Sequence, residues 1–385
     1  MTEIYFDNSS TTKPYQSVVD IVVKTMTEDY GNPSSMHQKG VEAEKYVRDA
    51  QKTLADILKV KPKEIFFTSC GTESNNWAIF ETAMANKRTG MTIITSPMEH
   101  PAVSEPLKLL AEQGFNIVTI PVDEEGKLKL DKLEEALNED VILVSIMYVN
   151  NEVGAVTPVK EIGNLIRTKA PNAAYHVDAT QAFGHYRIYP KEMHIDMLTA
   201  SGHKFHGPKG TGLLFIDERV KIKPLILGGG QQSAMRSGTD NVPGVAGMAL
   251  AAAESYKNFD EKNAYIRGLR DYLIEGLSKM EGVVIHGGKG EDQAPHIVNA
   301  AFTGVGSEVL LHSLEDYGIY VSAGSACSTH KRAPSPTLSA LHVDRADLSS
   351  SVRFSFSEFN TKEEIDETLK VLEKLLPMLR RYRAH

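Results

Sequence analysis

The sequence predicts an α/β protein with two domains: a large one built on a mostly parallel sheet of seven strands, and a smaller α+β one. Between about residues 65 and 216, short apolar runs rich in β-branched residues alternate with segments of helical period. This alternation is typical of a parallel sheet wrapped by helices. The chain of 385 residues also exceeds the length that one hydrophobic core usually serves, so we expect a second domain.

Seven apolar runs are the predicted strands of the large sheet. In chain order they cover residues 65–68, 92–95, 117–120, 142–146, 174–177, 197–200 and 212–216. Candidate helices lie between them, such as residues 104–113 and 159–169, and in the second of these Ile162, Leu165 and Ile166 recur at helical spacing. Ligands of such sheets bind just beyond the carboxyl ends of the strands.

The pattern changes after the three glycines at positions 228–230. A helix rich in small residues is predicted over 245–256, and mixed strands and helices follow until a last helix over 362–382. We therefore expect residues 15–250 to form the large domain, and residues 1–14 and 251–385 to form the small domain.

The composition is that of an ordinary globular protein. Hydrophobic residues make up 41% and charged residues 24%, which argues against long disordered regions. The net charge of −8 gives no attraction to nucleic acid or to anionic membranes. The N-terminus has no signal-peptide pattern, and no apolar run approaches the length of a membrane span. We expect a cytoplasmic protein that binds neither nucleic acid nor membrane.

The sequence gives little support for a metal site or for a disulfide scaffold. Cys70 and Cys327 are the two cysteines, too few for a disulfide scaffold or an all-cysteine metal site. His203 and His206 lack the helical His-Glu-x-x-His arrangement of a zinc site. We expect no metal.

Three features that follow predicted strands point to a phosphorylated aldehyde cofactor. A glycine-rich turn, residues 201–210, holds Lys204, and another strand ends at Asp178, whose burial would be costly without a cationic partner. A third strand ends at Thr68, the first residue of the stretch 68–76, where a helix begins near Gly71 and its free N–H groups favour phosphate. A lysine for a Schiff base, an anion for a pyridinium nitrogen and a phosphate cradle are what such a cofactor needs.

With these motifs the sequence resembles the fold-type I pyridoxal-phosphate enzymes, and specifically the cysteine desulfurases related to the sulfur donors of nitrogen fixation and iron–sulfur assembly. Nine segments occur in the order of that family, over nearly the whole chain. They are residues 31–35, 71–74, 99–100, 149–154, 176–181, 201–204, 236–239, 322–328 and 352–355.

The resemblance implies a role for each matching residue. Lys204 would form the Schiff base with pyridoxal 5′-phosphate, and Asp178 would keep the pyridine nitrogen protonated. His100 would stack on the ring and shuttle protons at the substrate sulfur. The remaining cofactor contacts would come from Gly71, Thr72, Ser201 and His203 at the phosphate, from Gln181 and Asn151 at the ring hydroxyl and adjoining groups, and from Thr239 of the second subunit of a homodimer.

Arg353 is predicted to bind the substrate. It lies in an apolar run, residues 351–355, where a guanidinium is expensive to bury alone. A bidentate clamp on the carboxylate of an amino acid, with Asn151 nearby, explains it. The alternative is a buried ion pair with a carboxylate of the protein itself.

Cys327 is the predicted nucleophile. It lies among small, flexible and basic residues, 323–336, which indicate an exposed loop, and Lys331 and Arg332 would favour the thiolate. The resemblance implies that Cys327 takes sulfur from L-cysteine, which leaves as L-alanine. The persulfide would then pass to an acceptor protein, such as an iron–sulfur scaffold or a tRNA-thiolation carrier. Cys70 is expected to serve packing.

Two other functions stay open at this point. An aminotransferase or selenocysteine lyase on the same scaffold would keep Lys204 but need no Cys327, and an inactive docking protein would form no alanine from cysteine. The chain also departs from the family pattern, which leaves the acceptor open. Ser10 stands where alanine is common, Gln232 where glutamate is usual, Glu358 follows the Arg353 strand, and residues 329–332 replace a stretch richer in glycine and serine.

Overall fold

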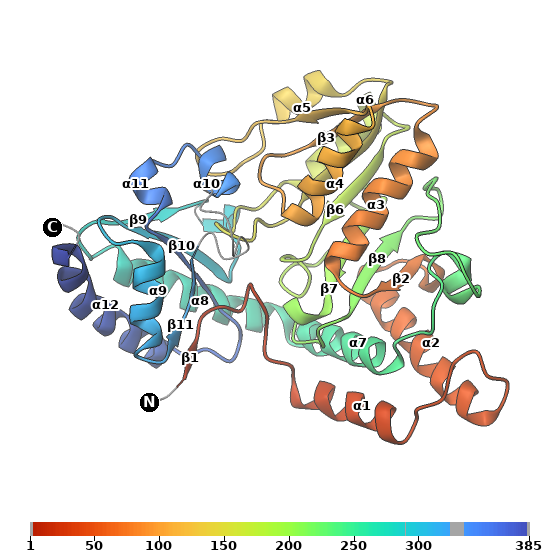
Figure 1. Cartoon of the computed structure of the whole chain (residues 1–385), viewed down its shortest axis with the longest axis horizontal. Helices are drawn as coiled ribbons and strands as arrows, with labels where there is room; N and C mark the ends of the chain where they lie inside the picture. Colours follow the sequence, from red (N-terminus) through yellow and green to blue (C-terminus); the bar gives the residue numbers. More distant parts are fainter. Residues whose placement is uncertain (1–2, 289, 324–334, 383–385) are drawn as a thin grey trace.

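Two parts of unequal size make up the molecule. The computed structural model describes residues 3–288, 290–323 and 335–382. The larger part surrounds a seven-stranded sheet, and the smaller part holds a four-stranded sheet, a two-stranded sheet and the C-terminal helix α12 (Figure 1). An α/β fold with a large sheet and a smaller α+β part was predicted, and it is confirmed.

The large sheet has the strand order β2-β8-β7-β6-β5-β3-β4. Strand β8 runs antiparallel to both neighbours, and the other pairs in the sheet are parallel. The bounds of the predicted strands differ from the observed ones by no more than one residue at either end. The strands are β2 (Ile65–Thr68), β3 (Thr92–Thr95), β4 (Asn116–Thr119), β5 (Val141–Met147), β6 (Ala174–Asp178), β7 (Met197–Ser201) and β8 (Gly212–Ile216).

Helices cover both faces of this sheet because both faces are apolar. Neighbouring residues of a strand point to opposite faces, so Phe66 joins the core under α3 and α4, while Phe67 joins the core under α2, α6 and α7. The helices of the large part are α1 (Gln16–Thr27), α2 (Gln38–Leu58), α3 (Gly71–Asn86), α4 (Pro101–Glu112), α5 (Leu130–Ala136), α6 (Val159–Lys169) and α7 (Val242–Tyr256).

The smaller part is built on the sheet β12-β13-β10-β9, with its own buried core. Its strands are β9 (Val283–His286), β10 (Ile297–Phe302), β12 (Ser322–Ala323) and β13 (Ser351–Ser355), and its helices are α8 (Phe259–Leu277), α9 (Ser307–Glu315), α10 (Pro336–Ala340), α11 (Arg345–Leu348) and α12 (Lys362–Tyr382). Short 3-10 turns cover Pro62–Glu64, Gly202–Lys204, Gln231–Ala234 and Gly290–Asp292.

In space, the N-terminal strand lies beside the C-terminal part of the chain. Strand β1 (Ile4–Tyr5) pairs in parallel with β11 (Ile319–Tyr320), and the chain then crosses to α1 below the large sheet (Figure 1). A domain boundary at residue 250 would fall inside α7, which packs against α1 and α2. The division into residues 15–250 and residues 1–14 with 251–385 stays a prediction.

No helix in the described part of the chain combines the length and the apolar character that crossing a bilayer requires.

The end of β2 meets β8 so closely that only glycine fits at position 212. Gly212 pairs with Thr68, and an added Cβ would clash with Thr68 Oγ1 and lie 2.6 Å from the carbonyl carbon and oxygen of Cys70. Helix α3 begins at the next residue, Gly71. The close pairing therefore fixes the turn that leads into α3.

We expect Gly212→Ala to lower the free energy of unfolding by about 1–3 kcal/mol, because the overpacked backbone of the turn must move. Urea denaturation checks this. Gly268→Ala is the matched control, since a Cβ at this position of α8 meets no atom within 4 Å. The control should be neutral or gain up to about 1 kcal/mol from helix propensity. Equal effects of the two substitutions would contradict the packing argument.

Candidate active site

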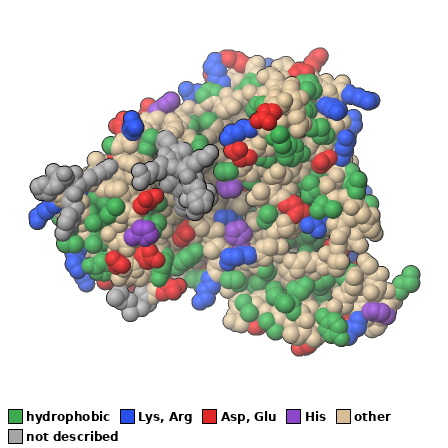
Figure 2. Space-filling view, in the orientation of Figure 1, with side chains coloured by type: hydrophobic (Ala, Val, Ile, Leu, Met, Phe, Trp, Pro, Cys, Tyr) green, Lys and Arg blue, Asp and Glu red, His purple; other side chains and the backbone are tan. Residues whose placement is uncertain are grey.

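A cavity of about 790 Å³ lies at the carboxyl ends of β3, β5, β6 and β7, facing the smaller sheet. The surface is visibly hollowed between the two parts of the molecule, with histidine and basic side chains in and beside the hollow (Figure 2). The structure brings ten of the predicted site residues to this cavity: Gly71, Thr72, His100, Asn151, Asp178, Gln181, Ser201, His203, Lys204 and Arg353.

One further predicted site residue lies away from the cavity lining, and another is outside the described residues. Thr239 is exposed and is not part of the cavity lining. Cys327 lies outside the described residues, as do Lys331 and Arg332. The nearest described residues on either side of Cys327 are Ala323 and Ser335, and both line the cavity.

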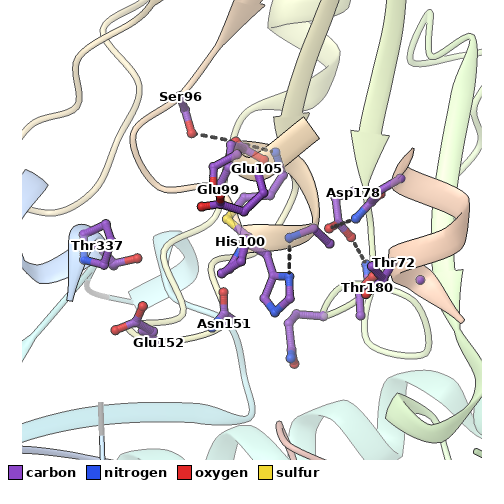
Figure 3. Close-up of a pocket in the computed structure, with 18 of the residues that line it drawn as sticks. Thr72, Ser96, Glu99, His100, Glu105, Asn151, Glu152, Asp178, Thr180 and Thr337 are labelled. Atoms are coloured by element: carbon purple, nitrogen blue, oxygen red, sulfur yellow. Dashed lines mark hydrogen bonds between the residues drawn. The ribbon is translucent and has the colours of Figure 1, made fainter. Parts of the chain in front are cut away.

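Asp178 ends β6 with its carboxylate held by two neutral donors. The backbone N–H of Thr180 donates to Oδ1 at 2.9 Å, and Asn75 Nδ2 donates to Oδ2 at 2.7 Å. Asp178 and Thr180 lie on the side of the cavity where α3 begins (Figure 3). Two hydrogen bonds orient the carboxylate and leave further lone pairs for a donor in the cavity. The role of Asn75 was not predicted, because it depends on α3 packing beside β6.

His176 lies one pleat below Asp178 in the same strand. Its Nδ1 is 2.8 Å from Ser145 Oγ, and its Nε2 is 3.0 Å from Thr199 Oγ1. Burial lowers the pKa of His176 to about 4, although the nearby Asp178 opposes the shift. A neutral imidazole therefore supports the end of β6.

Lys204 follows β7 in a 3-10 turn and is held by the N-terminal segment. Its Nζ donates to the carbonyl oxygens of Ser9 at 2.5 Å and Ser10 at 2.8 Å. The Ser9 carbonyl also accepts from Gln181 Nε2 at 2.9 Å. Residues of the N-terminal crossing thus position both Lys204 and Gln181 at the cavity, a contribution that the sequence motifs did not reveal.

The start of α3 has the chemistry of an anion cradle. Helix α3 runs for 16 residues from Gly71, and its first N–H groups have no partner within the helix. Ser201 Oγ, which lines the cavity nearby, is buried and has no hydrogen-bond partner among the described residues. A Cβ at Gly71 would come within 3.2 Å of Thr180 Oγ1 and 3.4 Å of Ser201 Cβ, so glycine keeps this space open.

These features fit pyridoxal phosphate. The Ser201 hydroxyl, which has no partner in the described part of the chain, and the helix start suit a phosphate. The oriented Asp178 carboxylate suits a protonated ring nitrogen, and the Lys204 amine suits an aldehyde.

The segment that carries Thr239 is tied to the same helix start. Arg236 Nε donates to Glu73 Oε1 at 2.9 Å, and the Ser69 backbone N–H donates to Glu73 Oε2 at 2.9 Å. Burial would raise the pKa of Glu73, but the hydrogen bonds from Arg236 and Ser69 lower it overall. The ion pair anchors residues 236–239 beside the cradle while leaving Thr239 exposed.

His100 caps α4 and points its ring into the cavity (Figure 3). The backbone N–H of Ala102 donates to Nδ1 at 3.1 Å. Because Nδ1 accepts, the proton of the neutral ring is on Nε2. Burial is the largest cause that lowers the pKa of His100, so the neutral form dominates. The cap also explains why α4 begins at Pro101, three residues before the predicted helix.

Glu99 is a buried carboxyl beside His100. Its Oε1 accepts from Ser96 Oγ at 2.6 Å and from the backbone N–H of Met147 at 3.0 Å, whereas its Oε2 is buried without a partner among the described residues. Burial raises the pKa of Glu99 to about 8. The motif Glu99-His100 was recognised in the sequence, but no role for Glu99 was predicted.

Arg353 reaches the cavity from β13 and is paired with a carboxylate of the protein. Its Nη2 donates to Asp7 Oδ1 at 2.8 Å and to Ser10 Oγ at 2.7 Å, and its Nη1 donates to the Asn151 carbonyl at 2.7 Å. Its Nε is buried without a partner in the described part of the chain. The buried ion pair that the sequence left open as an alternative is therefore present.

Glu152 closes the side of the cavity near the smaller sheet, opposite Asp178 (Figure 3). Its Oε2 accepts from Ser335 Oγ at 2.5 Å, and Ser335 also caps α10 through the N–H of Leu338. Burial raises the pKa of Glu152. This contact ties Ser335, the first described residue after position 334, to the cavity wall.

Within the described residues, no group of three or more His, Cys, Asp or Glu side chains is arranged to hold a metal ion.

Known proteins match this chain over nearly its full length. The family model of class-V aminotransferases matches residues 4–368. Cysteine desulfurase IscS of Methanosarcina thermophila is 42% identical over 377 residues, which cover 98% of this chain and 93% of that protein. A NifS-like protein of known structure has a TM-score of 0.93 at 39% identity, covering 98% of this chain and 100% of its own. The structure of SspA in complex with cysteine has a TM-score of 0.80 at 28% identity, with coverage of 94% and 100%.

We expect the raised pKa of Glu99 to change how the stability of the protein depends on pH. Its carboxyl titrates near 4.5 when unfolded and near 8 when folded, so the unfolded chain loses its proton first and stability falls as pH rises through this window. Glu99→Gln cannot titrate. Its stability relative to the wild type should therefore rise by about 2–4 kcal/mol from pH 5 to pH 8. Urea denaturation at both pH values measures it.

Glu105→Gln is the control for this prediction, because Glu105 is an exposed carboxyl at the same cavity. It should follow the wild type at both pH values. A pH-independent difference between Glu99→Gln and the wild type would show that Glu99 is ionised in the folded protein at pH 5.

Proposed function

The chain belongs to the class-V aminotransferase family, and from this premise we propose that it is a cysteine desulfurase that binds pyridoxal phosphate and takes sulfur from L-cysteine. The observation that carries the proposal is the gathering of Lys204, Asp178, His100 and Arg353 at one cavity, at the carboxyl end of the sheet. The relatives named cysteine desulfurase align with nearly the whole chain.

We assign the cofactor to the side of the cavity where α3 begins. Lys204 would bond the cofactor aldehyde through Nζ, and Asp178 would bind the ring nitrogen of the cofactor. The remaining contacts would be Ser201, His203, Gly71 and Thr72 at the phosphate, and Gln181 and Asn151 at the ring hydroxyl and adjoining groups. In the structure without a ligand, burial, with nearby Lys204 and Lys209, lowers the pKa of His203 to about 4. When bound, pyridoxal phosphate supplies an aldehyde that bonds amines and a ring that withdraws electrons from the α-carbon.

The substrate would lie between the cofactor position and the smaller sheet. Arg353 would bind its carboxylate beside Asn151, and Lys204 Nζ would take the α-proton. His100 has its ring proton on Nε2 in the neutral form, because Nδ1 accepts from Ala102. It is therefore set to donate a proton into the cavity, where the carbon–sulfur bond of the substrate breaks.

Sulfur transfer needs a nucleophile, which we assign to Cys327. Its thiolate would attack the substrate sulfur, the carbon–sulfur bond would break, and the β-carbon would gain a proton. L-cysteine and one thiol then give L-alanine and one persulfide, so atoms and electrons balance without another oxidant. Ala323, which lines the cavity, lies four residues before Cys327 in the chain, and this supports the assignment.

The persulfide would pass to an acceptor protein that serves iron–sulfur cluster assembly or tRNA thiolation. We also propose a homodimer in which Thr239 of one subunit completes the phosphate site of the other. Thr239 is exposed and does not line the cavity of its own chain, and the Arg236–Glu73 ion pair fixes the segment that presents it. Both features suit a residue that acts in a second subunit.

We expect borohydride to fix the cofactor on Lys204. After incubation with pyridoxal phosphate and reduction, mass spectrometry of the wild type should find the added mass on the peptide that contains Lys204. Lys204→Ala should show no such peptide, because the amine that bonds the aldehyde is gone. Lys209→Ala, which removes an exposed amine of the same turn, should be labelled like the wild type. Labelling at another lysine would overturn the assignment.

We expect Cys327→Ala to abolish sulfur transfer without loss of the cofactor. Alanine formation from cysteine should fall by roughly 100-fold or more, because the nucleophile is missing, while the visible absorbance of the bound cofactor persists. Cys70→Ala should keep most of the activity, since Cys70 is not assigned to the reaction. An active Cys327→Ala enzyme would instead favour an aminotransferase or a selenocysteine lyase on this scaffold.

A further inference from the structure

In the described structure, Arg353 does not have two adjacent N–H donors available for a ligand carboxylate. A guanidinium clamps a carboxylate either end-on, through Nη1 and Nη2, or side-on, through Nε and Nη2. Both modes use a hydrogen of Nη2. Nη2 has two hydrogens, and its partners are Asp7 Oδ1 at 2.8 Å and Ser10 Oγ at 2.7 Å. A bidentate clamp on a substrate therefore requires one of these two contacts to give way.

Ser10 is the weaker of the two partners. Asp7 forms an ion pair with Arg353, whose side chain is only 9% exposed, and a charge-assisted bond of this kind is the stronger one. Ser10 offers only a neutral hydroxyl oxygen. Its own hydrogen is already used, because Ser10 Oγ donates to Asp7 Oδ1 at 2.8 Å. Ser10 can thus release Arg353 and still keep its bond to Asp7.

Ser10 also faces the space where a substrate would arrive. It lines the same cavity as Arg353 and Asn151, and its backbone carbonyl accepts from Lys204 Nζ. Its hydroxyl thus contacts the guanidinium and its backbone carbonyl contacts the amine, so the residue lies between the two groups. At this position a hydroxyl competes directly with an incoming carboxylate for Nη2.

We propose that Ser10 is a specificity-determining residue that sets the affinity of this enzyme for the carboxylate of amino acids. Ser10 occupies one Nη2 hydrogen of Arg353, and the substrate carboxylate must displace it to form a two-donor clamp. The exchange weakens binding relative to an enzyme with a non-polar side chain at position 10. This inference rests on the proposed role of Arg353 as the carboxylate-binding residue.

The test compares the binding of two small ligands to the holoenzyme. L-alanine has an amine and a carboxylate, and cysteamine has an amine and a thiol but no carboxylate. Binding is followed by the absorbance of the bound cofactor. Ser10→Ala should lower the Kd of L-alanine by about three- to tenfold, because no hydrogen bond to Arg353 has to be exchanged. The Kd of cysteamine should stay at the wild-type value.

Two further variants control for a change of fold or of cavity shape. Ser10→Thr keeps the hydroxyl and should bind L-alanine like the wild type. Ser104→Ala removes another hydroxyl that lines the cavity and should leave both ligands unaffected. An unchanged or raised Kd of L-alanine in Ser10→Ala would overturn the inference, and so would equal shifts for L-alanine and cysteamine.

Arg353→Gln separates this inference from the proposed function. If Arg353→Gln binds L-alanine as tightly as the wild type, Arg353 does not hold the carboxylate and the proposed substrate site is wrong. If Arg353→Gln weakens L-alanine binding while Ser10→Ala leaves it unchanged, Arg353 keeps its role and the inference about Ser10 alone is wrong.

Discussion

The arrangement of the site depends on one short crossing of the N-terminal chain over the carboxyl ends of the large sheet. Strand β1 is bound to β11 in the smaller part, and the residues that follow contact groups from both parts. The carbonyls of Ser9 and Ser10 accept from Lys204, while Asp7 and Ser10 bind Arg353. One segment therefore sets the positions of the proposed cofactor lysine and the proposed substrate arginine, so a shift of either part changes both.

Two buried carboxyls near the carboxyl ends of the strands, Asp178 at the end of β6 and Glu99 in the loop after β3, have different surroundings. Asp178 has one donor on each oxygen, whereas both donors of Glu99 bind Oε1 and leave Oε2 buried without a partner in the described residues. A carboxyl with an empty buried oxygen favours the protonated form, which agrees with the raised pKa of Glu99. A protonated Glu99 thus leaves no second full negative charge beside Asp178, the proposed partner of the cofactor ring, at neutral pH.

The features that could be predicted from the sequence are those that a local pattern of residues determines. The strands were found almost to the residue because they are short apolar runs rich in β-branched residues. Lys204, Asp178 and Arg353 were found because each is a charged residue after or within such a run. Contacts across the fold were missed. Asn75 becomes a partner of Asp178 only when α3 packs on β6, and Asp7 reaches Arg353 because the chain after β1 pairs with the end of β13 at Ser355. The start of α4 was missed because the capping group is a histidine, an uncommon cap, which hides the boundary.

Burial also decides which groups carry the charge of the site. It lowers the pKa values of His100, His176 and His203 and raises those of Glu99 and Glu152, so each of these side chains moves toward its neutral form. Among the residues assigned to the cofactor and the substrate, the charged side chains that remain are Asp178, Lys204 and Arg353. They are spread across one cavity in an order that suits a pyridinium ring, an amine-bonding aldehyde and a carboxylate. A small zwitterionic amino acid would offer an amine to the proposed aldehyde and a carboxylate to Arg353. A ligand without a carboxylate would leave Arg353 with its contacts to Asp7 and Ser10.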